Sequence, residues 1–253
     1  MGIEDIFAIK SYHGYIFQIL LAEALFIPLF TKRSKFYLRV GIGLPLYILS
    51  CWIIANLLQF GLPQLTSFSI FLLSLGLGAA AFKDRFKNLV FCYAGAQLIQ
   101  NLAHNIEGVI YVPFAERFNV VGQFFHSVIV MVIVYIIAYF VIVKRMKRNL
   151  EFVIPTGAAL FVELFSVLFC YVVQAAMREL MPTAHWISIF PLILCDLLTI
   201  ALSFGFISYL AKANENRELE RLIAQSDEYY AMVANNIEAI NMKAHDLKHF
   251  IDG

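Results

Sequence analysis

Apolar positions form long unbroken stretches over most of the chain, and polar positions dominate its last forty residues. The stretches are about twenty residues long, the length at which a helix crosses the hydrocarbon of a bilayer. They lack the alternation of apolar and polar residues that is typical of membrane β-strands. The pattern predicts seven membrane-spanning helices, and six remains open because the third stretch is short and the fourth is polar. The predicted spans are residues 14–30, 36–59, 65–82, 89–112, 121–143, 152–176 and 186–210.

The composition agrees with this pattern. The 253 residues are 61% hydrophobic and only 15% charged, whereas soluble proteins carry about 25% charged residues. We therefore expect an all-α, polytopic membrane bundle over residues 1–211 and a separate polar helix over residues 212–253. The net charge of +1 gives no sign of a nucleic-acid partner.

Lysine and arginine residues gather in every second connection between the predicted spans. These connections hold eleven basic residues, against three (Lys10, Arg117 and Arg178) in the alternate set. Because loops rich in Lys and Arg stay in the cytoplasm, we expect a multi-pass protein of the cell membrane with its N-terminus outside and its C-terminus in the cytoplasm. The eleven residues are Lys32, Arg33, Lys35, Arg39, Lys83, Arg85, Lys87, Lys144, Arg145, Lys147 and Arg148.

The polar tail has a heptad pattern of apolar residues. With Leu219 at position a, the a row is largely apolar, whereas the d row turns polar at Asn236 and Lys243. Ile237, Ala244 and Ile251 then continue the apolar row one step later, a change of phase that a coiled coil tolerates. The pattern predicts a parallel homodimer, with a solvated amphipathic helix as the alternative. The a row is Leu219, Ser226, Val233, Ile240 and Leu247, and the d row is Leu222, Tyr229, Asn236, Lys243 and Phe250.

His245 lies at position f of this register, opposite the predicted seam, and Asp246 follows it. A carboxylate beside an imidazole fixes its tautomer and accepts its proton, which leaves a nucleophilic nitrogen near neutral pH. Lys248 is three residues further on, where its ammonium could contact phosphate oxygens. His245 and His249 also have the spacing of metal ligands, but no third ligand lies nearby, so we expect no metal site. A surface His-Asp pair with no chemical role is the other interpretation.

The segment His245-Asp246-Leu247-Lys248-His249-Phe250-Ile251, after a helix that leaves a multi-span membrane region, resembles the phosphoacceptor box of sensor histidine kinases. The nearest group is the Agr-type quorum-sensing receptors and their relatives with a GHKL-type ATPase domain. The resemblance implies that His245 is phosphorylated, that Asp246 is the base and that Lys248 contacts phosphate. It also implies a homodimer, an extracellular small ligand or peptide, and a cytoplasmic response regulator as partners.

The rest of the sequence lacks motifs that accompany the phosphoacceptor box in this family. No second dimerisation helix, Asn-containing ATP box or glycine-rich lid occurs in residues 1–253. We therefore expect no cofactor on this chain, with ATP and Mg²⁺ held by a kinase domain outside the sequence. The chain is then the N-terminal part of a kinase, or a kinase-less receptor that works with a kinase in trans.

The fourth predicted span has a polar face. Its polar residues recur at steps of three and four, so they share one side of the helix. Polar groups in hydrocarbon are costly unless they are paired or face a cavity. We expect them to line a ligand pocket or, equally, to join helices by hydrogen bonds. These residues are Gln97, Gln100, Asn101, His104, Asn105 and Gly108, with Glu107 close by.

Three acids lie near the middle of their predicted spans, at Glu23, Glu163 and Asp196. No Lys or Arg lies at the same depth, so we expect them to be protonated or bonded to side chains such as His104 or Asn56. Acids at this depth also occur in proton-coupled transporters, which makes transport the alternative function. No internal repeat supports it.

Overall fold

The structure is a computed structural model that describes residues 12–58, 63–111, 120–144, 146, 157–180 and 185–252. Apart from one isolated β-bridge, the regular structure in these residues is helical, which confirms the all-α prediction. Two units are present, Met1–Ile207 and Ser208–Gly253. Predictions for the N-terminal residues, Arg117, Arg145, Lys147, Arg148 and the start of the sixth span lie outside the described residues.

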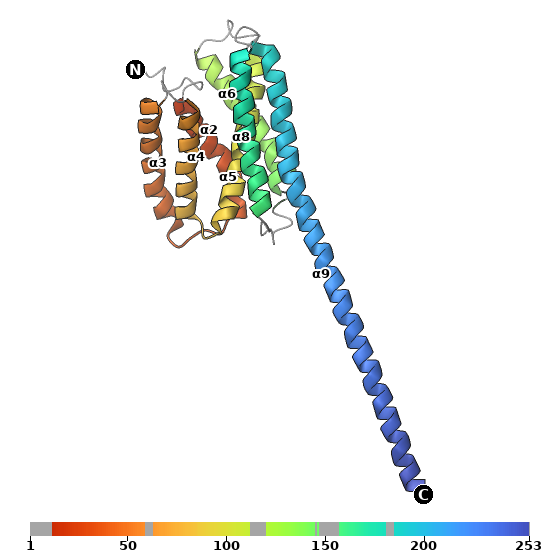
Figure 1. Cartoon of the computed structure of the whole chain (residues 1–253). Helices are drawn as coiled ribbons and strands as arrows, with labels where there is room; N and C mark the ends of the chain where they lie inside the picture. The colour runs from red at the N-terminus through yellow and green to blue at the C-terminus, as the bar shows by residue number, and fades with distance from the viewer. Residues whose placement is uncertain are drawn as a thin grey trace. The chain divides into compact units, whose positions relative to one another are not determined.

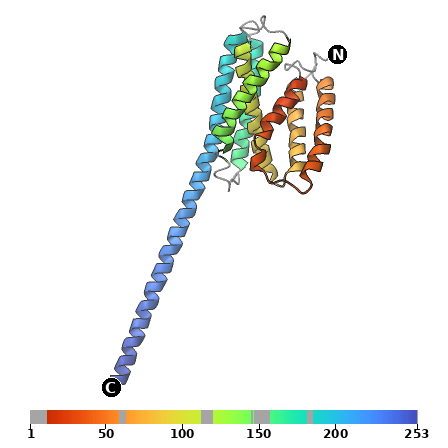
Figure 2. The ribbon, with the colours of Figure 1, turned by 180° about the vertical axis from the view of Figure 1, so that it is seen from behind.

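The first unit is a bundle of helices (Figures 1 and 2). The bounds of these helices follow the apolar stretches of the sequence. Three segments within them are long and apolar enough to cross a membrane: Phe36–Leu57, Phe125–Val143 and Ile189–Phe206. Shorter apolar helices cover Gly14–Leu29, Thr66–Ala81 and Leu164–Val173. The helices are α2 (Tyr12–Ala24), α3 (Phe36–Leu58), α4 (Pro63–Ala81), α5 (Phe86–Tyr111), α6 (Val120–Ala138), α8 (Gly157–Leu180) and α9 (His185–Asp252).

The first predicted span is broken in the structure. We predicted one helix over residues 14–30, but α2 ends at Ala24 and a 3₁₀ turn, Ile27–Leu29, follows. Pro28 lies inside this turn, and proline has no N–H with which to continue the ladder of an α-helix. At the end of α6, by contrast, a π-helical turn, Tyr139–Val143, continues the fifth predicted span.

α5 is the centre of the first unit. It packs against α2, α4, α6 and α8, and every residue from Leu89 to Gln100 is buried. The outward faces of α3, α6, α8 and the part of α9 within this unit are instead apolar and exposed, as at Leu46, Ile129 and Phe165. A polar interior under an apolar surface is what a bilayer requires. The central position of α5 explains why this helix carries polar residues.

The α4–α5 contact depends on a glycine. A Cβ atom at Gly78 would lie 2.5 Å from the Tyr93 hydroxyl, whereas one at Gly76 would meet nothing within 4 Å. We expect Gly78→Ala to lower the free energy of unfolding by about 1–3 kcal/mol through this clash. Gly76→Ala on the same helix is the matched control and should leave it equal or slightly higher. Unfolding by SDS titration in mixed micelles measures both, and equal effects would contradict the packing.

The second unit is the part of α9 from Ser208 onward. Its described side chains are almost all exposed, including apolar ones of the predicted seam such as Leu219, Leu222 and Ile240, which are 52–64% exposed. A helix that exposes an apolar row in water is typical of a segment that has a partner. The dimer itself stays a prediction.

Candidate functional site

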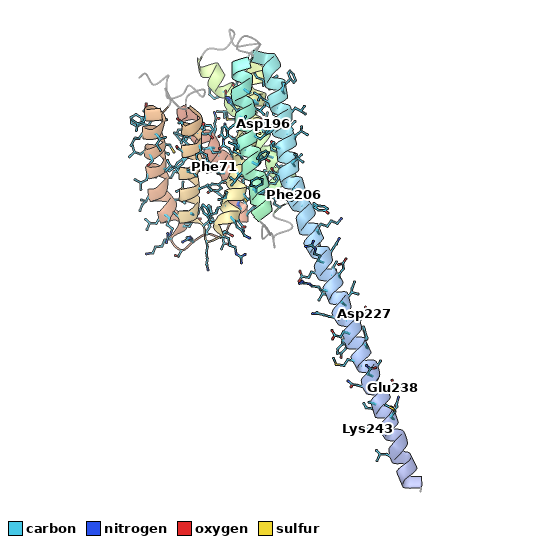
Figure 3. The ribbon with its side chains drawn as sticks, in the orientation of Figure 1. Phe71, Asp196, Phe206, Asp227, Glu238 and Lys243 are labelled. Carbon is cyan, nitrogen blue, oxygen red and sulfur yellow. The ribbon has the colours of Figure 1, made fainter. Side chains whose placement is uncertain are left out.

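Asp196 of α9 is the most enclosed acid of the candidate site (Figure 3). Its side chain is 1% exposed, and both carboxylate oxygens accept hydrogen bonds from α5. Asn101 Nδ2 donates to Oδ1 at 2.8 Å, and Asn105 Nδ2 donates to Oδ2 at 2.6 Å. The two asparagines are one turn apart, so they meet the two oxygens of one carboxylate. Asp196 thereby fastens α9 to α5.

The same face of α9 also contacts α8. Ser203 Oγ donates to Ser166 Oγ at 3.4 Å, and the Cys170 Sγ lies 3.3 Å from Thr199 Oγ1 and 4.0 Å from the Cys195 Sγ. Asp196, Thr199 and Ser203 recur at helical spacing and are all buried. The membrane part of α9 therefore has one polar face, which is held by two neighbouring helices.

Two glutamines of α5 bind α2. Gln97 Nε2 donates to the Tyr15 hydroxyl at 2.5 Å, and Gln100 Nε2 donates to Gln18 Oε1 at 2.9 Å. The Tyr15 hydroxyl lies 3.4 Å from the Tyr171 hydroxyl of α8. Because Gln97 and Gln100, like Tyr15 and Gln18, are three residues apart, the two bonds lie on facing sides of the two helices.

Near its C-terminal end, α5 binds α6. Glu107 is 3% exposed, and its Oε1 accepts a hydrogen bond from Ser127 Oγ at 2.8 Å. His126 Nδ1 lies 3.9 Å from the same oxygen. A buried carboxylate with a hydroxyl donor and a nearby imidazole is a satisfied interhelical contact.

Glu23 and Asp196 have partners that the sequence did not suggest. Glu23 Oε1 accepts a hydrogen bond from Ser74 Oγ of α4 at 2.5 Å. Asn56, which we expected near one of the acids, donates instead to the Trp52 carbonyl oxygen, 2.8 Å away in its own helix. The side chain of the third acid, Glu163, lies outside the described residues.

The predicted ligand residues of α5 therefore come together as one polar core. Five of the six make interhelical hydrogen bonds or contacts, which is the structural role that the sequence left open beside ligand binding. His104, the sixth, lies on the same helix, is half-buried and has an interaction partner as well. Binding of a ligand by these residues stays a prediction. The five are Gln97, Gln100, Asn101, Asn105 and Glu107.

A small pocket lies between α5 and α8 beside this core. It is about large enough for a single water molecule. Gln97 Oε1 is buried and has no hydrogen-bond partner among the described residues, so a water here would donate to it. A peptide does not fit this space. The lining residues are Gln97, Leu98, Asn101, Val167, Cys170 and Tyr171.

The predicted phosphoacceptor residues lie in the second unit. His245, Asp246 and Lys248 all belong to the helical backbone of α9, and the structure describes their backbone alone. The neighbouring described side chains, Lys243 and Leu247 among them, are exposed. The segment thus has the helical conformation that the prediction requires.

Sequence reasoning missed the partners of the polar core. Gln18, Ser74 and Ser127 each stand in an apolar helix, and each bonds a polar residue of another helix. The signal that could have found Gln18 is its isolation, because a glutamine in an apolar run has to find a partner. Serines carry a weaker signal, since a serine can also bond to the backbone of its own helix.

No protein-family model, no curated protein and no solved structure matches the chain. The class of protein therefore follows from the fold and the site. In the part of the chain that the structure describes, the protein is all-helical, with three helices long and apolar enough to cross a membrane, a buried polar core and a long C-terminal helix.

Proposed function

We propose that the chain is the membrane sensor and the beginning of the phosphoacceptor region of a two-component sensor histidine kinase. In this proposal the helices of the first unit form seven spans. An extracellular small ligand or peptide alters how α5 and α8 hold α9, and α9 transmits the change to His245 in the cytoplasm. A response regulator then receives the phosphoryl group.

The observation that carries the proposal is the composition of α9. This one helix, His185–Asp252, contains both the buried acid Asp196 and the pair His245-Asp246. The face around Asp196 is polar inside a membrane segment, where such residues mark functional or packing sites. A ligand that binds one arrangement of α5 and α9 better than another shifts the population between them.

The chemistry at His245 is a phosphoryl transfer. An imidazole nitrogen attacks the γ-phosphorus of ATP, the N–P bond forms as the P–O bond to ADP breaks, and the ring proton passes to the Asp246 carboxylate. The proposal assigns to Lys248 a contact with the phosphate oxygens. ATP and Mg²⁺ are expected on a GHKL-type domain, whose motifs are not among residues 1–253.

Mass spectrometry of membranes from cells that naturally make the chain tests the proposal. Trypsin cleaves after Lys243 and Lys248, so the peptide Ala244–Lys248 carries His245 without His249. At alkaline pH, which preserves phosphohistidine, we expect this peptide to carry one phosphate. Recovery of the unmodified peptide alone throughout growth would contradict the proposal.

The homodimer has its own test, which uses paired cysteine variants in a background without the four native cysteines. Ile240 lies at position a of the predicted seam, whereas Glu238 lies at position f on the opposite side. We expect Ile240→Cys to form an intermolecular disulfide on mild oxidation and Glu238→Cys to form almost none, because cysteines more than about 7 Å apart between Cα atoms cannot bond. Equal cross-linking at both positions would argue for the solvated helix.

Transport remains the second candidate function, and the buried acids favour it. Glu23, Glu107 and Asp196 are at most 5% exposed and come from three different helices. Such groups form proton relays in transporters. Proton flux into proteoliposomes that depends on Glu23 and Asp196, without any phosphate on His245, would favour this function over the sensor.

A further inference from the structure

Two short loops of the first unit are joined at one end of the bundle, the lower end in Figure 1. Lys32 forms a β-bridge with Phe82, Arg33 N donates to the Ala81 carbonyl oxygen at 3.0 Å, and Lys83 N donates to the Thr31 carbonyl oxygen at 2.9 Å. The bonds hold residues 31–35 and 82–85 side by side. We call these residues the basic loop pair.

The basic loop pair has a strong excess of positive charge. Its residues, 31–35 and 82–85, include five basic residues and one acid, Asp84, and Arg39 follows in the first turn of α3. The Asp84 carboxylate accepts a hydrogen bond from Thr31 N at 2.6 Å, so it is engaged with the backbone. The grouping also agrees with the sequence prediction that both loops lie on the same side of the membrane.

Some of these cations already have a structural partner. Arg33 Nε donates to the Phe82 carbonyl oxygen at 2.5 Å, and Arg39 Nη1 donates to the Ala80 carbonyl oxygen at 3.4 Å. Both arginines thus cap the C-terminal end of α4, where carbonyl groups lack helical donors. Lys32 Nζ lies 5.0 Å above the Phe36 ring.

Three cations remain available. Lys35, Lys83 and Arg85 are exposed, and none of them forms an ion pair with a described residue. They lie next to the start of the apolar segment Phe36–Leu57, beside the exposed rings of Tyr37 and Phe86. Aromatic rings and basic side chains in this combination are typical of the level of the lipid headgroups.

We propose that Lys35, Lys83 and Arg85 form a binding site for the phosphate of an anionic phospholipid. The loop pairing brings the segments of the three cations together, and their summed charge exceeds the single negative charge of Asp84, which favours a bound anion. The ring faces of Tyr37 and Phe86 accommodate the glycerol and acyl region of the same lipid. This site is independent of the proposed phosphorelay.

Native mass spectrometry of the whole chain in a neutral detergent tests the site, with phosphatidylglycerol and phosphatidylcholine as probes. We expect the wild type to bind phosphatidylglycerol roughly fivefold more tightly and the triple variant K35Q/K83Q/R85Q to bind both lipids about equally. The matched control K212Q/R217Q/R221Q removes the same charge from exposed positions of the tail, and it should retain the preference. A triple variant with the wild-type preference, or a control that loses it, would overturn the proposal.

Two further measurements test the source of the bound anion and the electrostatic nature of the contact. Inorganic phosphate at constant ionic strength should not displace phosphatidylglycerol, and displacement would instead identify a site for free phosphate. In the wild type, raising the salt concentration should reduce the preference for phosphatidylglycerol, because salt screens exposed charges. A preference that does not change with salt would overturn the proposal even if the triple variant failed to fold.

Discussion

Replacing His245 with glutamine is expected to remove all phosphate from the tryptic peptide Ala244–Lys248. Glutamine has no imidazole nitrogen and cannot form the N–P bond, whereas its high helix propensity leaves α9 intact. We therefore expect phosphorylation of this peptide to be lost completely and the helix content of the protein to stay almost unchanged. Mass spectrometry at alkaline pH and circular dichroism measure the two quantities on one sample.

His249→Gln is the matched control for this variant, because it makes the same substitution one helical turn further on. We expect phosphorylation at the wild-type level. Asp246→Asn keeps the size of the side chain and removes the proton acceptor, so the rate of phosphorylation should fall about 100-fold. Phosphorylation that persists in His245→Gln, or that disappears equally in His249→Gln, would show that the phosphoacceptor is another residue.

Replacing Asp196 with leucine is expected to lower the free energy of unfolding by about 2 kcal/mol. Interhelical hydrogen bonds in membranes contribute about 0.6 kcal/mol on average and at most about 1.7 kcal/mol. The leucine removes two of them and leaves the amide groups of Asn101 and Asn105 without an acceptor. Unfolding by SDS titration measures the change.

Two other variants make this measurement specific. Asp196→Asn retains one acceptor oxygen, so its free energy of unfolding should fall by about half as much, about 1 kcal/mol. Leu194→Ala alters the same helix at a side chain that is 59% exposed, and should change stability by no more than about 0.5 kcal/mol. If Asp196→Leu were no less stable than Leu194→Ala, the contact between α5 and α9 would not hold the helices together.

The helices were predictable from the sequence because each apolar stretch is long and continuous. For example, we predicted a helix over residues 36–59, and α3 runs from Phe36 to Leu58. The main error was to predict one continuous helix over residues 14–30, where α2 ends at Ala24 and Pro28 lies in a 3₁₀ turn. Proline in the first stretch was a visible signal of it. The count of seven spans goes beyond the three segments that are clearly long and apolar enough.

The polar face of α5 was also predictable, but its partners were not. The period of three and four residues placed Asn101 and Asn105 on one side of a helix. Which helix packs there depends on how the bundle folds, and no local pattern in α9 singles out Asp196 as the partner of α5. The prediction of a phosphoacceptor at His245 rests on sequence resemblance, because a helical backbone alone does not specify a reaction.

In the proposed mechanism, α9 transmits the state of the membrane core to the cytoplasmic helix. Asp196→Asn weakens the contact of α9 with α5 and needs no known ligand, so it can stand in for a change of state. The decisive measurement compares disulfide cross-linking at each position from 219 to 243 in the wild type and in Asp196→Asn. We expect the strongly cross-linking positions to move to a different heptad phase beyond Asn236, where the apolar row shifts. An identical pattern in both proteins would contradict transmission through α9.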